Sequence, residues 1–342
     1  MDHKKTEKQK KNQILLSILT LILISALGAA VFIAQRQADS EVIPEAGTSW
    51  NADHSKEYIV YQDKQYPVIR RLSTLLLIGT DNFAEEEDQL LSGGLRNRAL
   101  ADFLVVLVFD HEKKTVTPFQ FNRDTICEVP WLDADGKTGG WKSEHLTYAH
   151  SYGSGKEDSC ENTVAAVRKL IWNAPVDHYY AFTMDAVPVL NDLVGGVTVK
   201  LDEDIPGLGA KYVKGAEITL KGAEALRFIR YREHSGGSNL FRMQRHRQYL
   251  SAFLETAKAS VAKNQDLVVD AFKMVDPFIC TNMTVNSLSE MVDQLCSYEM
   301  MDVVTPAGVI KLGEKYYEFH PYEDSLWDCV YTAFCRKKVS AG

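Results

Sequence analysis

Several short motifs that mark common enzyme classes are missing from this sequence. Its 342 residues contain no GxSxG nucleophile elbow, no Walker phosphate-binding loop and no HExxH zinc motif. The six cysteines include no CxxC pair, and the nine histidines show no spacing typical of metal ligands. The sequence therefore argues against a serine hydrolase, a nucleotide kinase, a zinc protease and a zinc ribbon.

An excess of basic residues is also missing. The chain has 38 lysines and arginines against 46 aspartates and glutamates, a formal net charge of −8. Residues 1–34 hold five of the lysines and two of the acids, so the remainder has 33 basic and 44 acidic residues and a net charge of −11. This acidity argues against nucleic acid as a partner, and a site for an anion must come from local clustering of arginines.

One hydrophobic run is long enough to cross a bilayer. Residues 14–34, ILLSILTLILISALGAAVFIA, form 21 positions without a charge. The lysines of residues 1–13 keep that end in the cytoplasm. We therefore predict a single-pass protein of the cell membrane with a cytoplasmic N-terminus and an extracytoplasmic C-terminal domain. A cleaved signal peptide is the alternative interpretation of the small residues at 26–30, and it exports the domain as well.

Predicted strands and helices interleave along the rest of the chain. Apolar or alternating runs predict strands at 71–81, 101–110, 115–124, 177–184 and 197–205. Helical periodicity predicts helices at 159–172, 185–196, 221–234 and 238–263, with two further helical patterns and a hairpin in 264–342. A turn at 111–114 makes an antiparallel hairpin of the strands that flank it. We predict an α/β fold, a single α-β-α domain with a central mixed sheet, preceded by one transmembrane helix.

All six cysteines follow the predicted membrane span, where disulfides are favoured. They are Cys127, Cys160, Cys280, Cys296, Cys329 and Cys335. Six cysteines allow fifteen connectivities. Short separations favour pairing of Cys329 with Cys335 and of Cys280 with Cys296. Cys127 and Cys160 would then form a third disulfide that closes a longer loop. Buried free thiols are the alternative.

Arginine is concentrated in one stretch of the chain. Six of the fourteen arginines after the predicted span lie between Arg227 and Arg247. A guanidinium is planar, permanently charged and suited to phosphate. The cluster predicts a site for a phosphate or diphosphate, and a solvated basic face is the alternative. The candidate ligands are Arg230, Arg232, Arg242 and Arg245.

Two aspartates mark the ends of neighbouring predicted strands. Asp81 closes LLLIGTD and Asp102 opens ADFLVVLVFD. If these strands are antiparallel neighbours, the two ends meet. Two carboxylates together with phosphate oxygens make an octahedral oxygen site for Mg²⁺. The alternative is a turn residue and a capping residue without a metal.

An arginine and an aspartate follow directly where the strand 115–124 ends. Ligand sites of α/β folds lie at such strand ends, so Arg123 is placed to reach a phosphate and Asp124 to orient it. A surface ion pair of little energetic value is the alternative.

The ordered set of segments resembles a known family. After a short basic tail and one membrane helix, the matching segments are LLLIGTD, ADFLVVLVFD, FNRDT, HLTYAHSYG, ENTVAAVRKLI, VDHYYAFTMDAVPVLNDLVGGVTV, LKGAEALRFIRYR and FRMQRHRQ. Together they resemble the LytR–CpsA–Psr family of cell-envelope proteins, over residues 70–260. The resemblance implies a cytoplasmic tail at 1–13, a transmembrane helix at 14–34, an extracytoplasmic stalk with a first strand at 35–68, and a catalytic domain at 69–338.

The resemblance implies a phosphotransferase. Such an enzyme moves a glycosyl phosphate from a polyprenyl diphosphate-linked glycopolymer onto peptidoglycan. It implies that Asp81 and Asp102 bind Mg²⁺, with Mn²⁺ as a substitute, and that Asp124 orients Arg123. The implied diphosphate ligands are Arg123, Arg230, Arg232, Arg242 and Arg245. A polyprenyl diphosphate hydrolase and a non-catalytic regulatory protein that binds lipid phosphate are the alternatives.

Two positions depart from the family pattern. Many members have Arg-Ser-Asp where this chain has Leu100, Ala101 and Asp102, and Arg98 is the expected substitute for the missing arginine. Many also have an aspartate where this chain has Asn239, which leaves the base that activates the acceptor unassigned.

Overall fold

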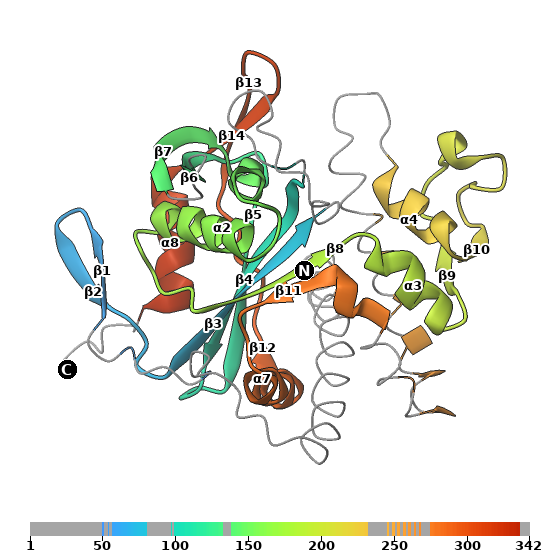
Figure 1. Ribbon diagram of the computed structural model, residues 1–342, viewed down its shortest axis with the longest axis horizontal. Coiled ribbons are helices and arrows are strands. Elements are labelled where there is room, and N and C mark those ends of the chain that lie inside the picture. The colour runs from blue at the N-terminus through green and yellow to red at the C-terminus, as the bar shows by residue number, and fades with distance from the viewer. Residues whose placement is uncertain are drawn as a thin grey trace, which may run out of the picture. The chain divides into compact units, whose positions relative to one another are not determined.

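The chain folds into two compact units in the computed structural model. We call Pro44–Thr183 with Ile279–Gly342 the sheet unit and Met184–Phe278 the insert unit. The sequence predicts a single domain, whereas the structure has two units: the chain leaves the sheet unit after Thr183, forms the insert unit, and returns to the sheet unit at Ile279 (Figure 1). The residues described are 50, 54, 57–80, 97, 99–132, 138–231, 245, 248–249, 252–253, 256–257, 259–260, 263–264, 267 and 274–335.

A mixed six-stranded sheet forms the centre of the sheet unit. Its strands in spatial order are β11 (Ile279–Thr281), β8 (His178–Thr183), β3 (Leu72–Thr80), β4 (Ala101–Asp110), β5 (Thr115–Phe121) and β12 (Glu299–Met300). β8 is parallel to β3 and β12 is parallel to β5, whereas the other neighbours are antiparallel. The predicted α/β class with a central mixed sheet is confirmed.

The central strands follow from their local sequence. Every residue of β3 is buried, and the apolar run at 75–78 within it suits a strand that is covered on both faces. Asp110 closes β4, and its carboxylate accepts hydrogen bonds from the backbone N–H groups of Glu112 and Lys113, both at 3.0 Å. This aspartate fixes the turn, so the predicted β4–β5 hairpin forms. One boundary is wrong, since β5 ends at Phe121 and the next residues turn.

Two helices cover one face of the sheet. α2 (Glu157–Leu170) and α8 (Glu323–Phe334) bury side chains in the same core cluster as alternate residues of β3 and β4 (Figure 1). A third helix, α7 (Val285–Ser297), is tied to the sheet by Trp50. The indole N–H of Trp50 donates to Gln294 at 2.8 Å, and its ring meets the Phe109 ring edge-on at 5.0 Å.

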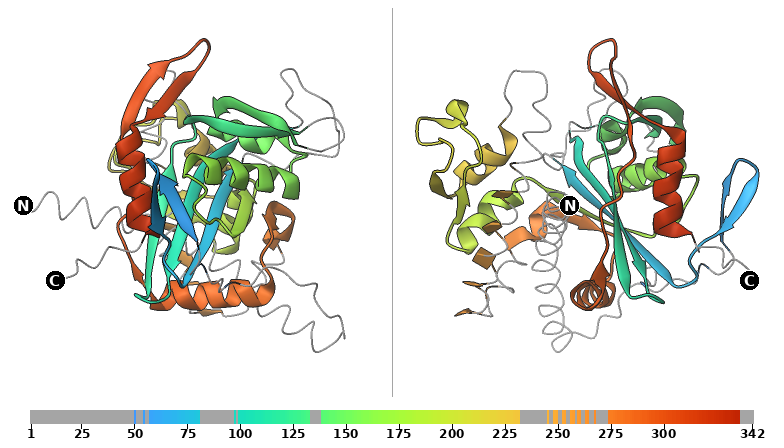
Figure 2. Two further views of the ribbon diagram at one scale, coloured as in Figure 1. Left: turned by 90° about the vertical axis from the view of Figure 1, so that its left-hand side faces the viewer. Right: turned by 180° about the vertical axis from the view of Figure 1, so that it is seen from behind.

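Three two-stranded hairpins extend the sheet unit. They are β1 (Tyr58–Tyr61) with β2 (Lys64–Pro67), β6 (Ile126–Leu132) with β7 (Thr138–His145), and β13 (Gly308–Leu312) with β14 (Tyr317–Pro321). The sequence predicts the β13–β14 hairpin, and of the β1–β2 hairpin it predicts one strand. It does not predict β6 and β7, where Gly139 lets the Trp131 ring lie against the backbone; a Cβ there would meet the ring at 2.5 Å. A 3-10 helix, η1 (Leu146–Tyr152), follows β7, and the β13–β14 hairpin projects beyond α8 (Figure 2).

The insert unit is built from short elements. They are α3 (Ala186–Leu193), β9 (Val197–Lys200), η2 (Pro206–Leu208), β10 (Glu217–Leu220) and α4 (Ala223–Arg230). α3 ends before Gly195 and Gly196, whose φ angles of +87° and +97° suit glycine alone. β9 pairs with β10 and is shorter than predicted. The predicted helix at 238–263 lies largely outside the described residues.

The predicted membrane span is not among the residues that the structure describes. Residues 1–13 and 14–34 both lie outside them. Within the described part of the chain, no helix is long and apolar enough to cross a membrane.

The predicted disulfides are wrong in this structure. Cys127, Cys160, Cys280, Cys329 and Cys335 are all free, and the side chain of Cys296 is not described. For the pair in α8 the reason is geometric. Cys329 lies within the helix and Cys335 caps its end, and six residues of helix separate Cα atoms by about 9 Å, beyond the reach of a disulfide.

His54 gives the stability of the sheet unit a pH dependence. Its ring is 4% exposed and lies 2.9 Å from Oε1 of Glu57 and 3.3 Å from Oδ2 of Asp177. Burial lowers the pKa of His54, but the hydrogen bonds and charges of the two carboxylates outweigh burial and raise the pKa to about 9 from 6.5. The contribution is therefore complete below pH 6.5 and is lost as the pH rises through about 9.

The variant His54→Gln isolates this contribution. We expect the free energy of unfolding of the variant to lie on the order of 2 kcal/mol below wild type at about pH 6, because the imidazolium is absent and the carboxylates of Glu57 and Asp177 lose their cationic partner. The gap should close by about pH 10, as measured by urea unfolding. A gap that does not change with pH would mean that the ring acts through packing alone.

Candidate functional site

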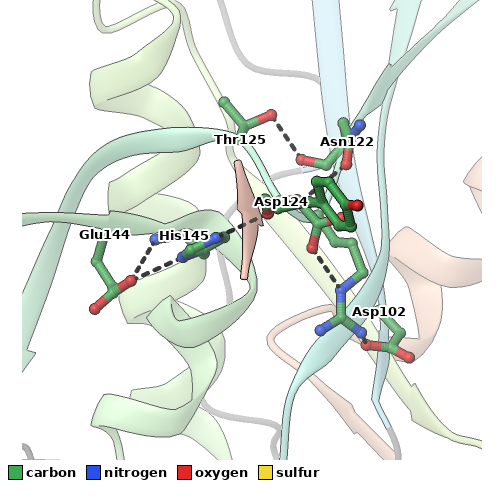
Figure 3. Close-up of polar contacts among 8 residues, drawn as sticks. Asp102, Asn122, Asp124, Thr125, Glu144 and His145 are labelled. Carbon is green, nitrogen blue, oxygen red and sulfur yellow. Dashed lines mark hydrogen bonds and ion pairs between the residues drawn. The ribbon is translucent and has the colours of Figure 1, made fainter. Parts of the chain in front are cut away.

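Arg123 lies at the edge of the sheet where β4 begins and β5 ends. Leu104 of β4 pairs with Phe121 of β5, so the antiparallel register brings the start of β4 beside the turn after β5. The Arg123 guanidinium forms an ion pair with the carboxylate of Asp102, and its Nε donates to Oδ1 of Asp124 at 3.3 Å (Figure 3). Arg123 thus contacts two carboxylates, one at the start of β4 and one just after the end of β5.

This ion-pair cluster is largely withdrawn from solvent. The side chains of Asp102 and Arg123 are 6% and 15% exposed, and that of Asp124 is 31% exposed. Exposed ion pairs contribute little, whereas buried charges need compensation to be tolerated at all. The alternative interpretation of Arg123–Asp124 as a surface ion pair is therefore wrong. The three side chains carry one net negative charge when ionised, which suits a site that also takes up a cation.

A β-bulge presents Asp102 to the site. Gly79 of β3 pairs with Phe103, and the next residue, Thr80, pairs with Ala101, so the register skips Asp102. Bulges of this kind turn a side chain out of the regular alternation and occur often beside active sites. At Gly79 a Cβ would lie 2.9 Å from Cβ of Phe103, so the close approach at the bulge depends on glycine.

The turn that carries Arg123 and Asp124 is held by the residues that flank it. The side-chain oxygen of Asn122 accepts the backbone N–H of Asp124 at 2.9 Å. The carbonyl of Asn122 accepts the hydroxyl of Thr125 at 2.7 Å and its N–H at 3.1 Å (Figure 3). Asparagine favours such turns because its side chain replaces a backbone acceptor. The guanidinium is therefore anchored on a rigid turn.

The backbone of this turn is clamped from both sides. The carbonyls of Arg123 and Thr125 accept the N–H groups of Thr147 and Leu146 in η1, at 3.0 and 2.8 Å. The carbonyl of Asp124 accepts the N–H of Phe319 in β14 at 2.8 Å. η1 and the β13–β14 hairpin thus fix the position of the charged cluster.

His145 links the same two supports. Its Nδ1 lies 2.9 Å from Oε1 of Glu144, and its Nε2 lies 3.1 Å from the carbonyl oxygen of Tyr317 in β14 (Figure 3). Its ring also meets the ring of Tyr148 at 5.9 Å. Burial raises the pKa of Tyr148 while the charge of Arg123 opposes the rise, so this phenol stays neutral beside the arginine.

The wider likeness of the chain identifies its family. The model of the LytR_cpsA_psr family matches residues 47–323. The chain belongs to the LytR_cpsA_psr family. The resemblance of its ordered segments is therefore confirmed.

Curated relatives in the LytR_cpsA_psr family cover most of the chain. The polyisoprenyl-teichoic acid–peptidoglycan teichoic acid transferase TagU of Bacillus subtilis strain 168 is 25% identical over 286 residues, 82% of this chain and 81% of that protein. TagU of Bacillus mycoides strain KBAB4 is 24% identical over 284 residues, 82% of this chain and 83% of that protein.

Solved structures of the family share the fold. B. subtilis TagV superimposes with a TM-score of 0.53 at 22% identity, covering 77% of this chain and 95% of that chain. TagT bound to LI-WTA gives a TM-score of 0.52 at 21% identity, covering 77% of this chain and 89% of that chain.

Only some of the site residues that the family resemblance implies lie in the described part of the chain. The structure brings Asp102, Arg123 and Asp124 together; the predicted contact between Arg123 and Asp124 is present, and the ion pair of Arg123 with Asp102 is additional to what the sequence predicts. Four candidate ligands and one departure from the family pattern lie outside the described residues: Asp81, Arg98, Arg232, Arg242 and Asn239.

The two described arginines of the predicted phosphate cluster differ in their surroundings. Arg230 is exposed at the end of α4. Arg245 is buried, and its guanidinium donates to Oε1 of Glu203 at 3.1 Å and to the carbonyl of Tyr231 at 2.5 Å. At Arg245 the alternative of a solvated basic face is wrong, because this side chain braces the end of α4.

Several supporting residues of the site escape a search for charged motifs. Asn122, His145 and Tyr148 act through hydrogen bonds and packing, which depend on the fold. The segments that hold them, FNRDT and HLTYAHSYG, are nevertheless among those that carry the family resemblance. The presence of these residues in segments shared with the family is therefore the sequence signal that could have identified them.

Proposed function

We propose that this chain is a membrane-anchored, extracytoplasmic phosphotransferase that moves a glycopolymer of the teichoic acid type from a polyisoprenyl diphosphate carrier onto peptidoglycan. The observation that carries the proposal is the largely buried guanidinium of Arg123, which pairs with two carboxylates at the end of the central strands. Membership of the LytR_cpsA_psr family and the transferases among its relatives support the substrate class.

The chemistry requires neutralisation of charge more than covalent catalysis. An acceptor hydroxyl attacks the phosphorus next to the sugar, the phosphoanhydride bond breaks, and polyisoprenyl phosphate leaves with the bonding electrons. Negative charge on the phosphate oxygens must be stabilised throughout. Arg123 offers planar donors for one of these oxygens, and the turn of Asn122 holds the guanidinium at a fixed place.

Asp102 fits a role as one of two carboxylates that hold Mg²⁺. Its side chain is carried by the bulge beside Thr80, and Asp81 is the next residue in the sequence. Hard carboxylate oxygens together with phosphate oxygens are the ligands that Mg²⁺ prefers. When bound there, the ion would supply further neutralisation of the diphosphate charge. Among the residues that the structure describes, no group of three or more histidine, cysteine, aspartate or glutamate side chains is placed to hold a metal ion, so phosphate oxygens and water would have to complete the shell around Mg²⁺.

The assignments in the insert unit complete the proposal. Arg230, Arg232 and Arg242 are proposed to hold the diphosphate. Arg245 contributes by supporting the end of α4 that presents Arg230 and Tyr231. The residue that removes the proton from the acceptor hydroxyl is not assigned, because Asn239 cannot act as a base.

A reconstituted transfer assay tests the function. The full-length chain in detergent is incubated with a polyisoprenyl diphosphate-linked glycopolymer, Mg²⁺ and peptidoglycan. We expect glycopolymer attached to peptidoglycan and an equal amount of polyisoprenyl phosphate, with both products lost after chelation of the metal.

The other outcomes of this assay separate the alternatives. Release of polyisoprenyl phosphate without attachment would identify a hydrolase that uses water as acceptor. Retention of the lipid without either product would identify a binding protein. In both cases the transferase proposal fails.

A further inference from the structure

Two cysteines from distant parts of the chain meet in the sheet unit. Cys160 is the fourth residue of α2 and is fully buried, and Cys280 is the central residue of β11. α2 packs against β11, and the Cys280 side chain packs against the core cluster that contains Cys160. The two thiols share a hydrogen bond. The two side chains are therefore neighbours in the core of the sheet unit.

The two thiols are electrostatically unequal. The hydrogen bond from Cys160 lowers the pKa of Cys280, and a hydrogen bond from Tyr179 adds to this effect against the opposing influence of burial. The same contact, together with burial, raises the pKa of Cys160. Cys280 is also the more exposed of the two. An accessible thiol with a lowered pKa beside a buried partner is the arrangement in which thiol–disulfide exchange is fast.

We propose that Cys160 and Cys280 form a disulfide in the mature protein, through exchange with a small-molecule disulfide of the extracytoplasmic space. The Cys280 thiolate attacks one sulfur of that disulfide and releases the first small thiolate. Cys160 loses its proton and attacks the sulfur of Cys280, which releases the second. The protein thiols are oxidised by two electrons, the small disulfide is reduced to two thiols, and the two protons pass to the leaving thiolates.

The position of the two cysteines indicates what a disulfide between them would stabilise. β11 has three residues, lies at the edge of the sheet and is the point where the chain returns from the insert unit. Its pairing with β8 is correspondingly short. A bond from Cys280 to α2 closes a loop of roughly 120 residues, which restricts the unfolded chain far more than a local staple does. The disulfide would therefore fasten the short strand at which the chain re-enters the sheet unit to α2.

Counting thiols by intact mass tests the bond without any assay of transfer. The full-length protein is incubated with oxidised glutathione, freed of it, denatured and alkylated. With six cysteines in the chain, wild type should carry four alkyl groups without reduction and six after reduction. The variant Cys280→Ser should carry five in both cases. The control Cys329→Ser, which alters a cysteine of α8, should carry three without reduction and five after it.

Two results would overturn the proposal. One is six alkyl groups, or a glutathione adduct in place of an internal bond, on unreduced wild type. The other is a Cys280→Ser protein with fewer than five, which would place the bond elsewhere. Peptide mapping of wild type should recover the segment of α2 linked to that of β11.

Thermal unfolding gives a second measurement that does not depend on alkylation. Reduction should lower the midpoint of wild type and of Cys329→Ser by roughly 5–10 °C, because the loop constraint is removed. It should leave the midpoint of Cys280→Ser unchanged. An equal effect of reductant on all three proteins would also contradict the proposal.

Discussion

Replacing Arg123 with lysine is expected to lower transfer roughly 100-fold while leaving the protein folded. The structure places the guanidinium against Asp102 and Asp124 at once. Lysine keeps the positive charge, so Asp102 retains a cationic partner. Its single ammonium cannot contact two carboxylates and a phosphate oxygen in one plane. The loss should appear in kcat/KM of the reconstituted transfer assay.

Arg168→Lys is the matched control for this variant. Arg168 is exposed on α2, and the same substitution there should leave transfer and the thermal midpoint unchanged. Wild-type kcat/KM in Arg123→Lys would show that the arginine serves only to balance the charge of Asp102. A loss shared equally by both variants would point away from the site altogether.

The substitution Asp102→Asn should abolish measurable transfer and also destabilise the protein. Asparagine keeps the size of the side chain but removes a proposed metal ligand and takes away the carboxylate charge that faces the largely buried Arg123 guanidinium. Removing one member of a buried ion pair costs about 3 kcal/mol or more in the free energy of unfolding.

A double variant separates the two effects. Asp102→Asn with Arg123→Gln removes both charges, so its free energy of unfolding should exceed that expected from the sum of the single changes. Transfer should remain absent in the double variant. The control Asp328→Asn, on the exposed side of α8, should be neutral in both measurements. Full activity and full Mg²⁺ dependence in Asp102→Asn would remove this carboxylate from the proposed metal site.

Features of this protein that depend on neighbouring residues were predictable from the sequence. β3 and β4 each contain a long apolar run, at 75–78 and 103–109, and Asp110 begins a turn, so these strands and the β4–β5 hairpin could be predicted. The family could be predicted for the same reason, because an ordered series of local segments carries the resemblance. Such patterns are recorded in consecutive residues.

The site could be predicted only in part. Arg123 and Asp124 are adjacent in the chain, so their contact needed no fold. The contact between Arg123 and Asp102 needed the register of β4 on β5 and the bulge opposite Gly79. A shift of one residue in either strand pairing would turn the Asp102 side chain to the other face of the sheet. The sequence named all three residues as candidates, but it could not say that Arg123 and Asp102 form an ion pair.

The tertiary structure alone decided which distant side chains meet. Sequence separation suggested local partners for the cysteines, whereas folding places Cys160 of α2 beside Cys280 of β11. Clustering of arginines suggested a common role, whereas Arg245 is buried against Glu203 and Tyr231. Local patterns determined the central strands, several helices and the family, because each of these is encoded in short stretches of consecutive residues. Pairings across the sheet and the core depend on register and packing, which no stretch of consecutive residues contains.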